Sequence, residues 1–177
     1  AQGTLRQITI APELPGALES IDRFTAAGTV VAIGHTEVDY ETARQSFAHG
    51  ARLLTHAFNA MPGIHHRDPG PLVAAFDDPN VAIELVADGI HVHPGVLEMT
   101  FRAAPERIVL VTDAMAAAGS ADGFYSIGSL NVVVKDGRAV LNGTDTLAGS
   151  TLTLDVALRT AITAARVPPA DAVAALT

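Results

Sequence analysis

The chain has 177 residues, 49% of them hydrophobic, and a formal net charge of -8 at pH 7. This length and hydrophobic content indicate a folded globular unit rather than a disordered chain, and the acidic balance argues against a nucleic-acid surface, which needs basic patches. The sequence has no apolar run of about 18 residues, as a membrane span requires, and no cysteine. A metal would therefore be held by His, Asp or Glu, and we expect a cytoplasmic protein that binds neither nucleic acid nor membrane.

Short β-branched runs alternate with segments of helical period in the first part of the chain. We predict five strands, at residues 7–10, 29–34, 52–55, 81–87 and 107–112. After the first strand, apolar residues recur at spacings of three and four, which predicts a helix that Gly28 ends. Thr36 is the predicted N-cap of a second helix that Gly50 ends, and Pro94 begins a third that runs to residue 104.

The pattern changes after Asp113. Residues 130–134 and 139–141 are two predicted strands, and the Asp-Gly pair between them indicates a hairpin. A last helix is predicted at residues 151–166, ended by two prolines. Strands that are continuous hydrophobic runs and alternate with helices indicate an α/β fold with a parallel sheet buried on both faces. Five such units fit an open doubly wound sheet or part of a closed barrel, and the pattern alone does not decide between them.

Polar residues stand where four successive predicted strands end. They are His35, His56, His91 and Asp113. In a (β/α)8 barrel these ends share one rim, where active sites are built, whereas in an open sheet they would spread along an edge. Three imidazoles and a carboxylate suit a divalent metal such as zinc. We expect two or three of the four to bind the metal and the others to handle protons or substrate.

The remaining histidines carry a weaker signal. We interpret His49 as a surface residue at a helix end, His65 and His66 as residues of a polar loop, and His93 as a residue that follows the strand-end group. Glu13, after the first strand, is either a carboxylate ligand or the start of the next helix. No glycine-rich phosphate loop is present, so a nucleotide is not expected.

Five segments match the motifs of a known family in order. They are Gly-His-Thr at 34–36, Thr-His-Ala-Phe-Asn-Ala-Met-Pro at 55–62, Ala-Asp-Gly-Ile-His at 87–91, Val-Thr-Asp-Ala at 111–114 and Asp-Thr-Leu-Ala-Gly-Ser at 145–150. The most specific stretch is 56–61, followed by Arg-Asp-Pro-Gly at 67–70. On these segments the chain resembles the N-acetylglucosamine-6-phosphate deacetylases, a family of metal-dependent barrels in the amidohydrolase superfamily.

The resemblance implies a divalent metal held by His35 and His56, either zinc or else iron or another divalent ion. It makes Asp113 the catalytic acid and base, while Arg67 would hold the substrate phosphate and His91 would reach the substrate. The substrate-binding residues that it implies are Asn59, Ala60, Arg67, Asp88, Gly89, Ile90, His91, Leu147, Ala148 and Gly149. The implied reaction is hydrolysis of the acetamide of N-acetyl-D-glucosamine 6-phosphate, in amino-sugar catabolism and cell-wall recycling, by a cytoplasmic homodimer.

The resemblance also sets the expected architecture. It implies strands 4–8 of a (β/α)8 barrel followed by a β-hairpin and a helix, with the hairpin as an insertion at about residues 124–143. The family's glutamate ligand, the earlier strands and a small β-domain would lie outside these residues. The side chains expected in the barrel interior are those of Ile8, Ile10, Val31 and Ile33. An amidohydrolase acting on a cyclic amide, or a non-catalytic barrel fragment, are the alternatives.

Overall fold

The structure is a computed structural model that describes residues 3–176. The chain divides into two compact units: the first runs to Leu85 and adds Arg102–Val109, and the second comprises Val86–Phe101 and the chain from Leu110 onward. None of the helices in the described residues combines the length and the apolar character that crossing a bilayer requires.

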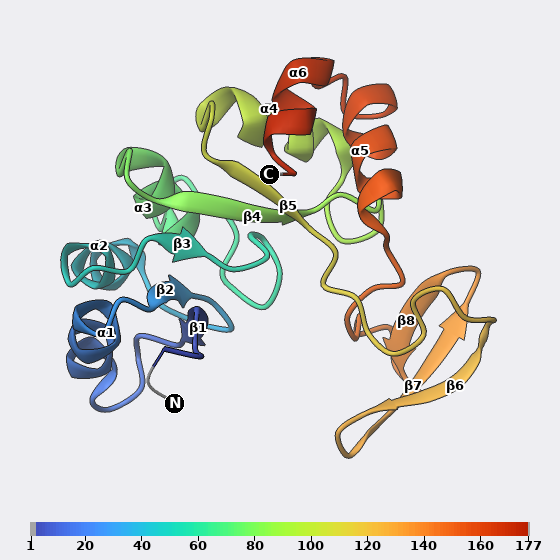
Figure 1. The fold of residues 1–177 in the computed structure, drawn as a ribbon, viewed down its shortest axis with the longest axis horizontal. Helices are drawn as coiled ribbons and strands as arrows, with labels where there is room; N and C mark the ends of the chain where they lie inside the picture. Colours follow the sequence, from blue (N-terminus) through green and yellow to red (C-terminus); the bar gives the residue numbers. More distant parts are fainter. Residues whose placement is uncertain (1–2, 177) are drawn as a thin grey trace. The chain divides into compact units, whose positions relative to one another are not determined.

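Parallel strands separated by helices build the first unit. The strands of its sheet are β1 Gln7–Ile10, β2 Val30–Ile33, β3 Leu53–Leu54, β4 Ala82–Val86 and β5 Ile108–Val111, of which Val86 and the last two residues of β5 belong to the second unit. They are arranged in the order β1-β2-β3-β4-β5, and β1 to β4 pair in parallel. Along one side of the sheet lie α1 Ala17–Ala26, α2 Tyr40–Ala48 and α3 Gly70–Asp77 (Figure 1). The five predicted strands are confirmed, each to within one residue at either end.

Two side-chain contacts show that this sheet is strongly curved. Nε2 of Gln7 on β1 donates to Oε1 of Glu84 on β4 at 3.0 Å, although strands three positions apart in a flat sheet are separated by about 14 Å. The hydroxyls of Thr9 on β1 and Thr55, directly after β3, lie 2.8 Å apart across β2. Both contacts lie on the concave face of the sheet, here called the inner face, as in the wall of a barrel.

Gly34 leaves room for the threonine contact, because a Cβ at this position would lie 2.8 Å from Cβ of Thr55. Side chains alternate between the two faces of a strand, so the odd-numbered positions of β1 and the even-numbered positions of β2 share the inner face. The prediction about the barrel interior is therefore wrong for Ile8, Ile10, Val31 and Ile33, which lie on the opposite face.

Two of the first unit's helices differ from the sequence prediction. Asp39, not Thr36, is the N-cap of α2, since its Oδ1 accepts from the amide of Thr42 at 2.8 Å. No helix was named at the position of α3. Its buried residues leave no polar face from which a helical period could be recognised, and they are Gly70, Pro71, Leu72, Ala74 and Ala75.

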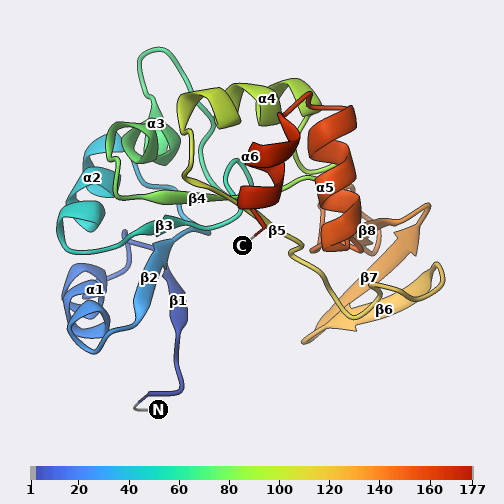
Figure 2. The ribbon, with the colours of Figure 1, turned by 45° about the horizontal axis from the view of Figure 1, so that its top comes forward.

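The second unit combines helices with a small antiparallel sheet. The strands of this sheet, in spatial order, are β6 Gly123–Ile127, β7 Leu130–Lys135 and β8 Arg138–Leu141. The helices are α4 Pro94–Ala103, α5 Leu154–Thr163 and α6 Pro169–Ala174. Helices α5 and α6 pack side by side (Figure 2). One side of the sheet packs on a small core of Met115, Ala117, Val132, Val134, Ala139 and Ala148.

The predicted hairpin is confirmed as β7 and β8, and α4 ends within one residue of its predicted end. Strand β6 was missed because it is not a β-branched run, and its Phe124 is 80% exposed. The helix predicted at 151–166 is shorter, and Pro169, expected to stop it, instead begins α6. Proline is tolerated in a first helical turn because the amide that it lacks would have no intrahelical partner there.

Candidate active site

Two predicted metal ligands follow neighbouring strands of the first unit. His35 stands two residues after β2 and His56 two residues after β3. Both have left-handed backbone conformations, with φ of 48° and 30°. Their ring centroids lie 4.7 Å apart, with the planes at 76°. His56 is 6% exposed, whereas His35 is exposed. The structure thus brings these two imidazoles together.

The ring of His56 has an unused nitrogen. Its Nδ1 is buried and has no hydrogen-bond partner among the described residues. Such an atom costs free energy unless a ligand takes up its lone pair, and neutral imidazole nitrogen is a common ligand of zinc. With the second imidazole beside it, the pair fits part of a metal site. Within residues 3–176 no group of three His, Cys, Asp or Glu side chains is placed to hold a metal ion, so the described residues do not form a complete ligand set.

Asn59 and Ala60, two of the predicted substrate-binding residues, also hold the loop that carries His56. Nδ2 of Asn59 donates to the carbonyl oxygens of His56 and Ala57, at 3.1 Å each. The carbonyl of Ala60 accepts from the amide of Thr36 at 3.0 Å, which joins the turns after β2 and β3. In the described part of the chain, Oδ1 of Asn59 and the amide of Ala60 have no hydrogen-bond partner, so both are available to a ligand.

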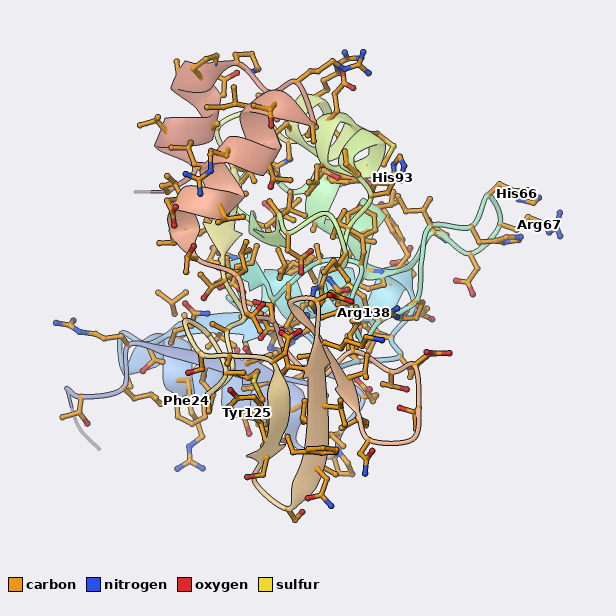
Figure 3. All side chains as sticks on the ribbon, turned by 90° about the vertical axis from the view of Figure 1, so that its right-hand side faces the viewer. Phe24, His66, Arg67, His93, Tyr125 and Arg138 are labelled. Carbon is orange, nitrogen blue, oxygen red and sulfur yellow. The ribbon has the colours of Figure 1, made fainter. Side chains whose placement is uncertain are left out.

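Arg67, predicted to hold the phosphate, lies in a tight turn. The amide of His65 donates to the carbonyl of Asp68 at 3.3 Å, and the amide of Asp68 donates back at 3.1 Å. Nη1 of Arg67 lies 2.6 Å from Nε2 of His66, and Figure 3 shows both side chains at the end of a projecting loop. Because a guanidinium only donates, His66 is the acceptor. The turn therefore presents an exposed guanidinium oriented by a neighbouring imidazole.

Glu13 has a structural role in this unit. Its Oε2 accepts from the Thr36 hydroxyl at 2.5 Å and its Oε1 from the Glu37 amide at 3.0 Å. Burial raises the pKa of Glu13, but the hydrogen bonds from Thr36 and Glu37 outweigh it and leave the pKa below its ordinary value. Both oxygens thus hold the segment after β2. Glu13 lies outside α1, whose N-cap is Gly16, so the prediction that it starts the next helix is wrong. His49 pairs with Asp22 at the surface, at 2.9 Å.

In the second unit, Asp88 organises the turn that carries His91. Its Oδ1 accepts from the amides of Ile90 and His91, both at 2.8 Å, and its Oδ2 lies 2.6 Å from Nδ1 of His91. Gly89 supplies the left-handed residue of this turn, with φ of 76°. Because a carboxylate only accepts, Nδ1 of His91 is the donor, and Nε2 is the ring nitrogen left for a ligand.

The Asp88 and His91 side chains are 9% and 5% exposed. Burial raises the pKa of Asp88, but hydrogen bonds from the ring and amide of His91 and from the amide of Ile90 outweigh it and lower the pKa. Asp88 was predicted to line the substrate pocket. Both of its oxygens are used within the turn, so it orients His91 whatever else it contacts. Ile90, 43% exposed, carries the accessible side chain of the segment.

Asp113 also stands two residues after its strand, with φ of 48°. Its carbonyl accepts from the amide of Ser150 at 2.7 Å, and the Ser150 hydroxyl donates to the carbonyl of Thr112. A Cβ at Gly149 would lie 3.1 Å from the carbonyl oxygen of Asp113. Glycine is therefore what lets the 147–149 segment pass so close to Asp113. The structure brings this segment and the predicted acid and base together.

The carboxylate of Asp113 is exposed and accepts no hydrogen bond from any described residue. Of the neighbouring segment, Leu147 and Gly149 are half-buried, but Ala148 is 9% exposed and belongs to the core of the small sheet. Its amide donates to the carbonyl of Ala139 at 3.1 Å. Ala148 therefore anchors the segment, and its neighbours carry the accessible surface.

The sequence prediction missed Glu84. It is an 8% exposed carboxylate on β4, and its Oε2 accepts from the amide of His56 at 3.3 Å. Its carbonyl accepts from the amide of Ala57 at 2.8 Å. A single charged residue in the otherwise apolar strand sequence Ala-Ile-Glu-Leu-Val was the available signal, because an unpaired charge is rarely buried.

No protein-family model matches the chain. It is 43% identical over 150 residues to an N-acetylglucosamine-6-phosphate deacetylase of Vibrio furnissii, covering 85% of this chain and 37% of that protein. It is 41% identical over 173 residues to an N-acetylgalactosamine-6-phosphate deacetylase of Escherichia coli O157:H7, covering 98% of this chain and 46% of that protein. Among solved structures, an aspartate-to-alanine variant of the Mycobacterium smegmatis N-acetyl-D-glucosamine-6-phosphate deacetylase, in complex with N-acetyl-D-glucosamine 6-phosphate, matches with a TM-score of 0.93. That match has 44% identity and covers 98% of this chain and 46% of the other.

The chain is related to the N-acetylglucosamine-6-phosphate deacetylases. The family resemblance inferred from the strand-end motifs is thereby confirmed, and so is the α/β fold with a parallel sheet that the chain shares with these deacetylases. The chain spans less than half the length of the deacetylases that it matches.

Proposed function

We propose that this protein hydrolyses the acetamide of N-acetyl-D-glucosamine 6-phosphate to glucosamine 6-phosphate and acetate. The observation that carries the proposal is the relationship to deacetylases of phosphorylated amino sugars over up to 98% of the chain. The paired imidazoles of His35 and His56 support it, because amide hydrolysis without a nucleophilic side chain needs a strong electrophile. A cyclic-amide hydrolase and a non-catalytic barrel fragment are not favoured by these relatives.

His35 and His56 would hold a divalent cation. Zinc suits imidazole ligands, and iron or another divalent ion is the alternative. When bound, such a cation polarises the acetamide carbonyl and makes an attacking water easier to deprotonate. The buried, unpartnered Nδ1 of His56 is the atom that this proposal assigns to the metal.

Asp113 would move the proton. Its exposed carboxylate takes a proton from the water that adds to the acetyl carbon, and returns it to the amine nitrogen as the C–N bond breaks. His91 would donate from Nε2 to the acetyl oxygen, while Asp88 fixes the ring through Nδ1. A donor aimed at the developing oxyanion stabilises the transition state more than the substrate.

Arg67 and Ala60 would bind the phosphate. The forked guanidinium of Arg67 matches phosphate oxygens, and the unpartnered amide of Ala60 is a second donor. Asn59 would contact the sugar through Oδ1. The remaining proposed substrate contacts are Gly89, Ile90, Leu147 and Gly149, and Ala148 would hold this last segment in place from the core of the small sheet. The cytoplasmic location and the homodimer stay predictions.

The 4-epimer, N-acetylgalactosamine 6-phosphate, is a second candidate substrate. The specific observation that favours it is the N-acetylgalactosamine-6-phosphate deacetylase of Escherichia coli O157:H7, whose match covers 98% of this chain. The two substrates differ only at one hydroxyl, so a site that hydrogen-bonds that hydroxyl would discriminate between them. The ratio of the two kcat/KM values decides which sugar is the substrate.

The test is acetate release by the full-length protein. Incubation with a chelator should abolish release from N-acetylglucosamine 6-phosphate, and addition of Zn2+ should restore it. Absence of acetate release from both phosphorylated amino sugars by the metal-loaded protein would overturn the proposed function.

A further inference from the structure

The buried carboxylate of Glu84 is unexplained by the proposed chemistry. It lies on the inner face of the sheet, while its neighbours Ile83 and Leu85, both 0% exposed, lie on the other. Burying a carboxylate is costly unless donors satisfy it. The Glu84 carboxylate has two donors, the side-chain Nε2 of Gln7 to Oε1 at 3.0 Å and the backbone amide of His56 to Oε2 at 3.3 Å.

Glu84 holds two consecutive amides of the loop after β3. Its carboxylate accepts from the amide of His56, and its carbonyl accepts from that of Ala57. His56 has φ of 30°, a conformation that costs free energy for a residue other than glycine. Two acceptors on one neighbouring strand therefore keep the His56 backbone in a conformation that it would otherwise leave.

This backbone conformation decides where the imidazole points. The ring is 6% exposed, and its Nδ1 has no partner among the described residues, so the direction of the ring is not fixed by a hydrogen bond of its own. Metal-ligating histidines ordinarily have a second partner that orients them. At His56 the orienting contact acts on the backbone instead of on the ring.

We infer that Glu84 is a positioning residue for His56, with Gln7 as its support. The carboxylate fixes the turn so that Nδ1 of His56 is presented to a divalent cation, and Gln7 holds the second carboxylate oxygen from β1. The inference rests on the proposed function, since it takes His56 as a ligand of that cation.

Glu84→Gln is the decisive variant, because glutamine has the same shape but only one side-chain acceptor for two donors. In the metal-free full-length protein, titrated with Zn2+ alone against a chromophoric chelator, we expect the Kd to rise by about 10- to 100-fold, the range for residues that orient a ligand. Ile83→Val is the matched control on the same strand. It should lower the unfolding temperature and leave the Kd unchanged.

Gln7→Leu provides a second variant, because Gln7 is exposed and its loss leaves the core intact. It should weaken Zn2+ binding by a smaller factor than Glu84→Gln, and it decides the matter should Glu84→Gln fail to fold. The positioning role would be overturned if the variants that fold bind Zn2+ with the same Kd as the wild-type protein. The proposed function would still stand in that case, provided that the wild-type protein binds Zn2+ and releases acetate. A wild type that neither binds Zn2+ nor releases acetate would overturn the proposed function itself.

Discussion

The two units hold their strand-end histidines in opposite ways. In the second unit, the Asp88 carboxylate accepts from Nδ1 of the His91 ring and from the amides of Ile90 and His91. All of these contacts lie within four residues. In the first unit, Glu84 holds only the backbone of His56, from 28 residues further along the chain, and leaves Nδ1 of the ring unpartnered among the described residues.

The difference matches two kinds of chemistry. A ring fixed through Nδ1 has a defined tautomer and offers Nε2 to a substrate. A ring held by its backbone leaves Nδ1 available to the proposed metal, since no group among the described residues bonds to that atom. The two rings therefore have different surroundings, as the proposed roles of His91 toward the substrate and of His56 toward a metal require.

The largest effect is expected at His56, the proposed metal ligand of the first unit. His56→Ala removes the unpartnered Nδ1, so the full-length protein should lose bound metal and acetate release together. Elemental analysis and the acetate assay on the same sample measure both. Full metal content in this variant would show that His56 is not a ligand.

Asp113, at the fourth of the strand ends, is held in neither way, since its carboxylate has no hydrogen-bond partner in the described part of the chain. Asp113→Asn should keep the fold and the binding of metal and substrate. The value of kcat should fall by roughly a hundredfold or more, as for other proton-transfer groups. Single-turnover rates and substrate Kd values test this, and a near-normal rate would remove Asp113 from the proposed mechanism.

Arg67→Ala tests binding away from the reacting group. KM for the phosphorylated sugar should rise by about 10- to 100-fold, the scale of a lost charge-assisted pair of about 1.5–3 kcal/mol, while turnover of the unphosphorylated sugar stays unchanged. His66→Ala, which keeps the guanidinium, serves as control and should change KM less. An equal loss for both sugars from Arg67→Ala would refute the phosphate contact.

Asp88→Asn removes the carboxylate that holds the ring of His91. The Asn side chain can offer an amide where His91 needs an acceptor, so kcat should fall by about tenfold, within the range for general acid–base groups and their supports. Zn2+ affinity should stay at the wild-type value, in contrast to Glu84→Gln. A Kd for Zn2+ that changes as much in Asp88→Asn as in Glu84→Gln would erase the distinction between the two histidines.

The smallest expected effect concerns pH. The pKa of Asp88 is lowered in the fold, so its contribution to stability is complete above the unfolded value of about 3.9 and is lost as the pH falls through the lower folded-state pKa. The unfolding temperatures of wild type and Asp88→Asn should therefore differ at neutral pH and converge in strong acid.

The sequence was enough to predict features that depend on local order. The parallel strands, the α4 helix and the β7–β8 hairpin follow from hydrophobic runs and turn residues, and the positions of His35, His56, His91 and Asp113 follow from the strands. The Asp88–His91 turn could also have been predicted, because an Asp side chain commonly accepts hydrogen bonds from backbone amides two or three residues further along the chain.

Features that depend on curvature could not be predicted in this way. Gln7 and Glu84 meet across 77 residues of sequence only because the sheet curls, and the face on which each β1 and β2 side chain lies follows from the same curvature. The alternation of strand residues gives two faces but does not say which is concave, which is why Ile8 and Val31 were placed on the wrong one.

The central claim is that the imidazoles after β2 and β3 share one divalent cation. The most direct test is an anomalous difference map at the zinc edge from crystals of the full-length protein soaked in Zn2+. The account predicts one peak within about 2.0–2.1 Å of Nδ1 of His56 and of a ring nitrogen of His35. A peak bonded to neither imidazole, or a pair of rings that stays unliganded while the soaked protein is active, would contradict it.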